Sequence, residues 1–222
     1  MKMDLAQLRG ELFSAVLGDV MDGMGLYHQM LPPEIRPLDP STVLAGFAMT
    51  VLEADCYGVE IASEEKQAPF GKMFAALDSL QPEEIYICTG GSGLYAQWGE
   101  LMSTRARVLG AAGAVVNGYS RDTKGILKMG FPTFSRGCYA LDQGVRGRVI
   151  DFRCAIEFPN GTVVEPGDLV FGDVDGVVVV PRGRIEEVIG AALEKVRGEN
   201  KVREAIEKGM STVEAFETFG IM

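Results

Sequence analysis

The sequence predicts a mixed α/β fold, because two parts of the chain carry different patterns. Residues 85–88 and 114–116 are short apolar runs, and each is followed by a segment with helical spacing, the first of which includes Trp98. Strands that alternate with helices favour a parallel pair whose strands are buried on both faces. Residues 145–180 instead contain several short strands separated by turns, among them a strand over 145–158 and a hairpin turn at Asn160-Gly161, which is typical of an antiparallel meander. We therefore expect a mixed central sheet.

Helices are expected at both ends of the chain. Apolar residues at helical spacing predict one or two helices over residues 4–24. Residues 43–55 are apolar and β-prone, and residues 70–80 have a helical pattern. Another apolar stripe, at positions 185–206, predicts a long amphipathic helix. Residues 211–214, Ser-Thr-Val-Glu, form a capping box that opens a last short helix.

Composition and charge limit the class of protein. The chain has 222 residues, of which 47% are hydrophobic and 23% charged. This predicts one domain over residues 1–222 with a buried core, N-terminal helices and a C-terminal helical extension. The net charge of −10 and the scattered basic residues argue against nucleic-acid binding. No apolar stretch approaches the roughly 18 residues of a membrane span and no signal core opens the chain, so we expect a cytoplasmic protein.

The few classical metal ligands do not form a recognisable metal motif. The only histidine is His28, and the four cysteines lack a C-x-x-C pair, so a structural zinc site is not expected. The cysteines are interpreted as buried or free thiols, and His28 as structural or exposed. Asp173 and Asp175 begin a Asp-x-Asp-Gly sequence without the downstream ligands of a calcium loop, which favours a plain turn between strands.

A glycine-rich motif follows the first predicted buried strand. Residues 91–96, Gly-Ser-Gly-Leu-Tyr-Ala, fit the pattern G-x-G-x-x-A of dinucleotide-binding loops. Such a loop also needs an acidic residue about 20 positions later to hold the ribose. Residues 111–116 contain none, so the motif does not support nucleotide binding.

Gly99, Glu100, Leu101 and Met102 lie near a predicted helix start. Amides of a first helical turn have no intrahelical partner, and the helix dipole favours an anion there. Gly99 would let a carboxylate approach the backbone closely. The alternative is that Gly99 only lets the helix pack tightly.

Arg121 and Asp122 follow the next predicted strand. Loops at the carboxyl ends of neighbouring parallel strands face one crevice, so this pair can converge with Gly99. Arg121 can grip a carboxylate or an enolate oxygen through its fork of donors, and Asp122 can offer one oxygen to Mg²⁺ or Mn²⁺. The alternative is that Asp122 caps its helix and Arg121 forms a surface salt bridge.

Several segments together resemble the family of regulator of ribonuclease activity A and 4-hydroxy-4-methyl-2-oxoglutarate aldolase. They are residues 96–102, 113–122, 130–137, 164–170 and 172–181. The resemblance implies a swivelling β/β/α sandwich assembled as trimers or paired trimers. It also implies a substrate carboxylate held by Gly99 to Met102, with Arg121 on the substrate and Asp122 on the metal.

The chain departs from the family pattern at two positions. The aldolase pattern has an acidic residue three positions after its metal aspartate, where this chain has Gly125, and many members have aspartate where this chain has Asn117. Loss of the acid at position 125 would weaken support for metal-bound waters. This departure bears on activity with the usual substrate more than on the fold.

The expected function is that of a lyase dependent on a divalent metal and acting on a small 2-oxo acid. Retro-aldol cleavage of a 4-hydroxy-2-oxo acid and decarboxylation of oxaloacetate both leave a pyruvate enolate, which Arg121 would stabilise. The base is not evident; a metal-held water or a carboxylate such as Glu199 of a neighbouring subunit could serve. The alternative is a non-catalytic regulator that binds a protein partner.

A homotrimer or homohexamer is expected from the resemblance and from apolar C-terminal residues, namely Phe216, Phe219, Ile221 and Met222.

Overall fold

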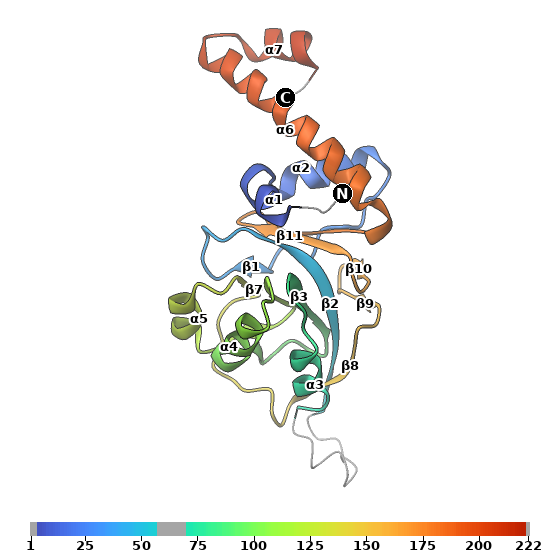
Figure 1. The fold of residues 1–222 in the computed structure, drawn as a ribbon, viewed down its shortest axis with the longest axis vertical. Coiled ribbons are helices and arrows are strands. Elements are labelled where there is room, and N and C mark those ends of the chain that lie inside the picture. The colour runs from blue at the N-terminus through green and yellow to red at the C-terminus, as the bar shows by residue number, and fades with distance from the viewer. Residues whose placement is uncertain (1–3, 57–69, 221–222) are drawn as a thin grey trace.

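A curved mixed sheet forms the centre of the molecule (Figure 1). The computed structural model describes residues 4–56 and 70–220. Within these residues the sheet has eight strands. In spatial order they are β1 (Arg36–Pro37), β7 (Thr133–Ser135), β5 (Gly113–Val116), β3 (Glu84–Gly90), β2 (Leu44–Asp55), β11 (Leu169–Asp173) and β12 (Gly176–Val180), with β8 (Gly147–Phe152) also paired to β2.

The strand directions confirm the predicted mixed α/β class and mixed sheet. β2, β3, β5 and β7 run parallel, and the register pairs Ile85 with Gly113 and Cys88 with Val116. The predicted antiparallel meander is correct for two hairpins, that of β11 with β12 and, outside the main sheet, that of Ile156–Glu157 with Val163–Val164. β8 does not pair with β11, because both pair with β2 along different parts of its length. The predicted strand over 145–158 is two strands, β8 and β9 (Ile156–Glu157), and Arg153 between them has a positive φ of 55°.

The two ends of the sheet approach one another, so the sheet nearly closes into a barrel. The Leu31 amide donates to the Val177 carbonyl at 2.9 Å, and the Arg36 guanidinium donates to the Asp175 carbonyl. Side chains alternate between the inside and the outside of this curved sheet. Ile85 and Ile87 join the interior cluster, whereas Tyr86 and Cys88 join the cluster beneath the helices. Burial on both faces explains why the strands are apolar runs without polar alternation.

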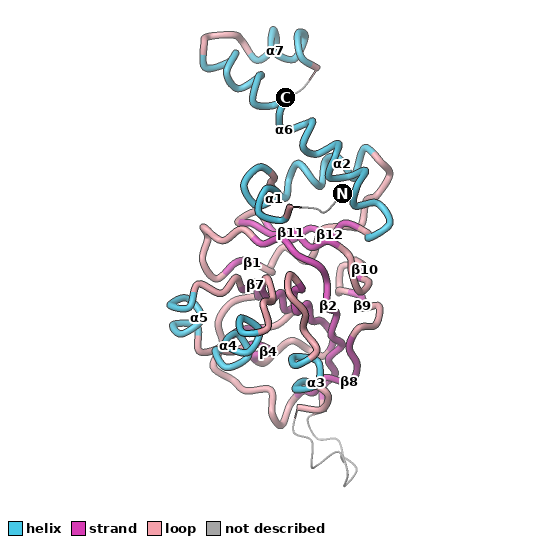
Figure 2. Tube along the Cα trace, in the orientation of Figure 1, coloured by secondary structure: helices cyan, strands magenta, loops and turns pink. Residues whose placement is uncertain are grey.

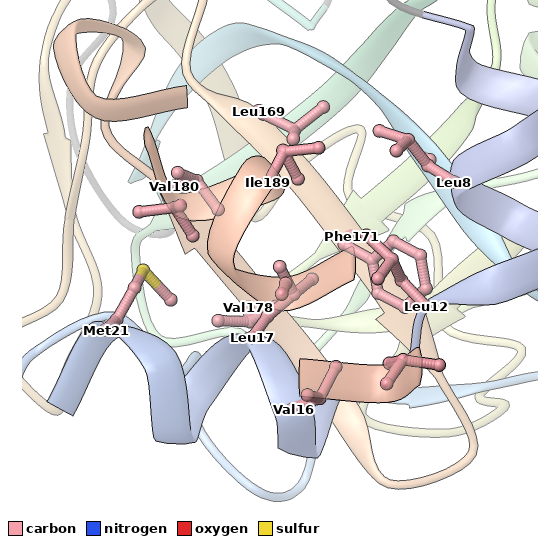
Figure 3. Close-up of a cluster of buried hydrophobic side chains, with 14 of the residues drawn as sticks. Leu8, Leu12, Val16, Leu17, Met21, Leu169, Phe171, Val178, Val180 and Ile189 are labelled. Carbon is pink, nitrogen blue, oxygen red and sulfur yellow. The ribbon is translucent and has the colours of Figure 1, made fainter. Parts of the chain in front are cut away.

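Helices cover the outside of the sheet in two groups. α1 (Leu5–Glu11), α2 (Ser14–Gly23) and α6 (Ile185–Glu207) pack over β11 and β12, and Figure 3 shows side chains such as Leu17, Phe171 and Ile189 meeting in this cluster. α3 (Met73–Asp78), α4 (Glu100–Val108) and α5 (Thr123–Met129) lie over the parallel strands (Figure 2). α6 extends past the body, and α7 (Thr212–Phe219) folds back along it (Figure 1).

The capping box is confirmed at Ser211 and Glu214, which each bond the other's backbone. Phe216 and Phe219 are 57% and 37% exposed on α7, and Ile221 and Met222 lie outside the described residues. Within the described ranges, no helix is both long and apolar enough to cross a bilayer.

Small elements complete the fold. β4 (Ala96–Trp98) pairs with β6 (Tyr119–Ser120) in parallel, β9 pairs with β10 (Val163–Val164) around the predicted Asn160-Gly161 turn, and Arg182–Arg184 form a 3₁₀ turn. Trp98 was expected on the helix and instead ends β4. Its indole Nε1 donates to Ser103 Oγ at 2.7 Å, which fixes the chain where strand passes into helix.

Asp173 lies in a strand turn, as predicted, and its carboxylate also holds the start of α2. It accepts hydrogen bonds from the Ser14 amide and the Ser14 hydroxyl, both at 2.7 Å, and from the Asp175 amide at 2.9 Å. The carboxylate is buried and its oxygens are occupied by these donors. His28 is exposed, as one of its two predicted alternatives had it.

Asp173→Ala should destabilise the protein by about 1–3 kcal/mol, because it leaves buried donors of Ser14 unpaired. The midpoint of urea denaturation measures this change. The matched control is Asp175→Ala, an exposed aspartate in the same turn, which should cost less than about 0.5 kcal/mol. Equal losses for both variants would show that the bonds to Ser14 contribute nothing.

Candidate functional site

The two predicted segments meet beside the carboxyl ends of β3 and β5. Gly99 is the N-cap of α4 and has an extended backbone, with φ −151°. The Arg121 amide donates to the Trp98 carbonyl at 2.9 Å, which ties the second segment to the first. A Cβ built on Gly99 would lie 3.1 Å from Asp122 Oδ2. The absence of a side chain at Gly99 therefore gives the Asp122 carboxylate its place beside the start of α4.

Asp122 occupies the N-cap position of α5 with a left-handed backbone, φ 56°. Its side chain makes no capping hydrogen bond, so the alternative that this carboxylate caps its helix is wrong. The side chain is 50% exposed and borders the space next to Gly99. A non-glycine residue held in this conformation at a cavity is a candidate for function, since strained backbone accumulates at such sites.

Arg121 forms an ion pair with Asp142, at 3.0 Å between Nη1 and Oδ1. Its Nε also lies 3.8 Å from Asp122 Oδ2. The salt bridge weighed as an alternative therefore exists, but it forms the wall of a cavity and leaves Arg121 39% exposed. Asp142 was not predicted from the sequence. It lies in an irregular segment that joins the site through isolated bridges, of Asp142 to Ala96 of β4 and of Cys138 to Ser120 of β6.

A cavity of about 420 Å³ opens in front of these residues. Gly99, Arg121, Asp122 and Asp142 form its polar side. Its other side is apolar. Phe70, three side chains of α3 and two of α4 form this side, namely Phe70, Met73, Phe74, Leu77, Leu101 and Met102. A cavity of this size with a few convergent polar groups is typical of a site for a small molecule.

Gln97 also lines the cavity, and sequence reasoning missed it. Its side chain is 1% exposed, and neither its amide nitrogen nor its amide oxygen has a partner within the described residues. A Cβ on Gly118 would lie 2.5 Å from Gln97 Oε1, so Gly118 makes the space for this amide. Buried amides normally find hydrogen-bond partners, but both amide atoms of Gln97 are shielded from solvent and lie beside Gly118, so they do not face the open cavity.

Glu100 takes the space left by the missing acid at position 125. A Cβ built on Gly125 would overlap the carboxylate of Glu100. Glu100, Asp122 and Gly125 line one shared recess of about 430 Å³. A carboxylate is therefore present beside Asp122, although it comes from the start of α4 and not from α5.

These residues fit a hard divalent cation. Mg²⁺ usually uses one or two protein carboxylates and completes its shell with waters and substrate. Asp122 provides one carboxylate at the cavity, and Glu100 lies in the adjoining recess, which Lys124 and Lys128 also line. Within residues 4–56 and 70–220, no three or more His, Cys, Asp or Glu side chains are grouped so that they could hold a metal ion. Waters and substrate would therefore complete the shell of a cation at Asp122.

A buried carboxylate with a raised pKa lies outside the lining of the cavity. Glu53, on β2, is 3% exposed and accepts a hydrogen bond from the Cys88 thiol at 3.6 Å. Burial raises the pKa of Glu53 to about 7, against a smaller lowering by Cys88, and the charge of Asp55 adds to the rise. Burial also raises the pKa of the Cys88 thiol. The signal in the sequence was a glutamate directly after the apolar run 44–52.

The free energy of unfolding should fall as pH rises from about 4.5 to about 7. In this window the folded protein keeps a proton on Glu53 that the unfolded chain has released, and above it neither state holds the proton. Glu53→Gln removes this contribution. The difference between variant and wild type in urea denaturation should therefore change by about 3 kcal/mol between pH 4 and pH 8, in favour of the variant. A difference that stays constant with pH would contradict the raised pKa.

Comparisons with known proteins relate the chain to one family. A family model described as RraA-like, aldolase/RraA, matches residues 14–179. Protein DlpA of Legionella pneumophila is 26% identical over 207 residues, which cover 93% of this chain and 32% of that protein. This chain thus spans about a third of the length of DlpA. A protein of Halalkalibacterium halodurans, whose name proposes a 4-hydroxy-4-methyl-2-oxoglutarate aldolase, is 29% identical over 203 residues. The match covers 90% of this chain and 87% of that protein.

A solved structure shows the same fold. RraAS2 of Streptomyces coelicolor, described as an unusual member of the RNase ES inhibitor RraA family, matches with a TM-score of 0.76 over 91% of this chain and 98% of its own. Its identity is 22%, so the likeness concerns the fold alone. The family model includes both segments of the site, and the resemblance predicted from the sequence is confirmed: the chain belongs to the RraA-like, aldolase/RraA family.

Proposed function

We propose that this protein is a carbon–carbon lyase that depends on a divalent metal and acts on a small 2-oxo acid. One observation carries the proposal: the start of α4, Arg121 and Asp122 line one cavity. One small molecule in this cavity could therefore meet the free backbone amides at the start of α4, the guanidinium of Arg121 and the carboxylate of Asp122. These groups can bind an anion, grip a carboxylate or enolate oxygen, and ligate a hard cation, respectively. The name of the Halalkalibacterium relative supports the same reaction class.

Each residue has a distinct task in this proposal. The amides of Glu100, Leu101 and Met102 lack intrahelical partners and bind the substrate carboxylate, while Gly99 lets it approach. Asp122 holds Mg²⁺ or Mn²⁺, with Glu100 beside it, and the bound cation supplies Lewis acidity for the 2-oxo group. Arg121 donates to the oxygen that gains charge as the substrate becomes an enolate.

The same site serves two cleavages. In a retro-aldol reaction the C3–C4 bond breaks, the C4 hydroxyl loses its proton, and a pyruvate enolate and a carbonyl compound form. In oxaloacetate the bond to the departing CO₂ breaks and leaves the same enolate. The described lining of the cavity contains no lysine for a Schiff base, which favours stabilisation of the enolate by charge.

The proton acceptor is proposed to be a water at the site or Glu199 of a second copy. Glu199 lies on α6, and Figure 1 shows that α6 projects from the opposite part of the molecule to α4. Glu199 could therefore reach the cavity only from another subunit. A homotrimer or homohexamer is accordingly part of the proposal, and the exposed apolar face of α7 with Val213 and Phe216 supports association.

Asp122→Ala should abolish pyruvate release from oxaloacetate and from 4-hydroxy-4-methyl-2-oxoglutarate, because it removes the proposed metal ligand. Mn²⁺ binding, followed by the electron paramagnetic resonance of free Mn²⁺, should weaken in parallel. The control is Asp19→Ala, which removes an exposed carboxylate paired with Lys195 on the opposite group of helices. Full activity of Asp122→Ala with Mg²⁺ present would sink the metal assignment.

Arg121→Lys tests the enolate role. Lysine keeps the charge and loses the planar fork, and a donor aimed at developing charge contributes about 3–4 kcal/mol. We expect kcat to fall about 10²–10³-fold, with KM changed much less. The readout is steady-state pyruvate formation. If KM alone rises, Arg121 only clamps the substrate carboxylate and the proposed role is wrong.

A further inference from the structure

We propose that the cavity selects 4-hydroxy-2-oxo acids with an apolar substituent on C4 and no second carboxylate. This deepens the proposed function and rests on it. The reacting end of the substrate would lie at Gly99, Arg121 and Asp122, and the C4 substituent would lie against α3 and the outer face of α4.

The apolar wall carries the first argument. Met73 and Leu77 are each 6% exposed and form its floor, whereas Phe74 and Leu101 are 54% and 84% exposed at its rim. Phe70 and Phe74 pack edge to face, with ring centroids 5.7 Å apart. Large apolar side chains exposed at the rim of a small-molecule cavity indicate that an apolar group covers them.

The charges of the cavity carry the second argument. Two arginines and three aspartates line it, so its net charge is −1. Both arginines are already paired, Arg121 with Asp142 at 3.0 Å and Arg105 with Asp78 at 2.7 Å. One divalent cation would bring the described lining to +1, which matches a single carboxylate. A second carboxylate would find no unpaired cation among these residues, and the one group that the proposed function brings from a second copy, Glu199, is itself a carboxylate. An unpaired charge at an apolar wall is costly.

The length of α4 sets the space for the substituent. The Arg105–Asp78 pair lies six residues beyond Gly99, which is about 9 Å along the helix axis. The apolar wall occupies the space between. This span accommodates the backbone of a 2-oxo acid and a short alkyl chain or one aromatic ring.

The reaction balances without a further reactant. The C3–C4 bond breaks, and its electron pair passes into the pyruvate enolate. The C4 hydroxyl gives its proton to water and becomes the carbonyl of an apolar aldehyde. The enolate then takes a proton from water at C3, so the products are pyruvate and the aldehyde.

The test compares kcat/KM for pyruvate release with Mg²⁺ on four substrates. Two are apolar at C4, 4-hydroxy-2-oxohexanoate and 4-hydroxy-2-oxo-4-phenylbutanoate. Two carry a second carboxylate, 4-hydroxy-4-methyl-2-oxoglutarate and oxaloacetate. We expect the apolar pair to be preferred by about tenfold or more, since matched apolar contacts typically discriminate by 10–200-fold.

Variants at the rim decide whether the wall causes the preference. Phe74→Arg places an unpaired cation on an exposed position of α3, and should shift the ratio of apolar to dicarboxylate kcat/KM at least about tenfold toward the dicarboxylates. The control Val108→Arg changes an apolar residue that is 71% exposed on α4 and does not line the cavity. It should leave the ratio as in wild type.

The outcomes separate this inference from the proposed function. A wild-type preference for the dicarboxylates would overturn the inference and leave the lyase in place. An apolar preference that Phe74→Arg does not shift would show that the wall is not its cause. No pyruvate from any of the four substrates would overturn the proposed function, and the inference with it.

Discussion

Strand β2 (Leu44–Asp55) is the element on which the rest of the structure depends. One edge pairs in parallel with β3 over Phe47 to Glu53, and the other edge pairs first with β11 and then with β8. The parallel strands and the antiparallel strands are therefore parts of one sheet. Because both faces of this sheet are covered, the apolar side chains of its central strands enter packed clusters on either face, and a one-residue shift of register would exchange these clusters.

This arrangement also determines where the site forms. β3 and β5 are neighbours that end together, and each passes into a short strand and then a helix: β4 and α4 after β3, β6 and α5 after β5. The pairing of β4 with β6 brings the starts of α4 and α5 side by side. Gly99 and Asp122 stand at these two starts. Their close approach is thus a consequence of backbone pairing, which holds the carboxylate in place without a side-chain bond to its helix.

The sequence predicted those features whose signal is local. Helical spacing predicted α1, α2 and α6, and apolar runs predicted β2, β3 and β5. The position of Gly99 at the start of a helix is confirmed, and the anion site there stays a prediction. The short strands β1, β4, β6 and β7 were missed, because two or three residues carry no readable period. Two other features depend on residues that are far apart in the sequence. Asp142 pairs with Arg121, which lies 21 positions earlier, and Glu53 contacts Cys88, which lies 35 positions later. Contacts of this kind leave no local pattern in the sequence.

Gly125 shows how a motif can mislead when it is compared position by position. An acid is missing from α5, yet the carboxylate of Glu100 fills the same space from α4. On the proposed function this has an electrostatic consequence. The recess that holds Glu100 and Asp122 also holds Lys124 and Lys128, so its four formal charges sum to zero, whereas the cavity itself carries −1 with its arginines paired. A divalent cation at Asp122 would reverse the charge of the cavity to +1, so an anionic 2-oxo acid would bind most readily after the cation or together with it. This order of binding would follow from the aspartates of the cavity, and Glu100, whose charge is balanced within its own recess, would not set it.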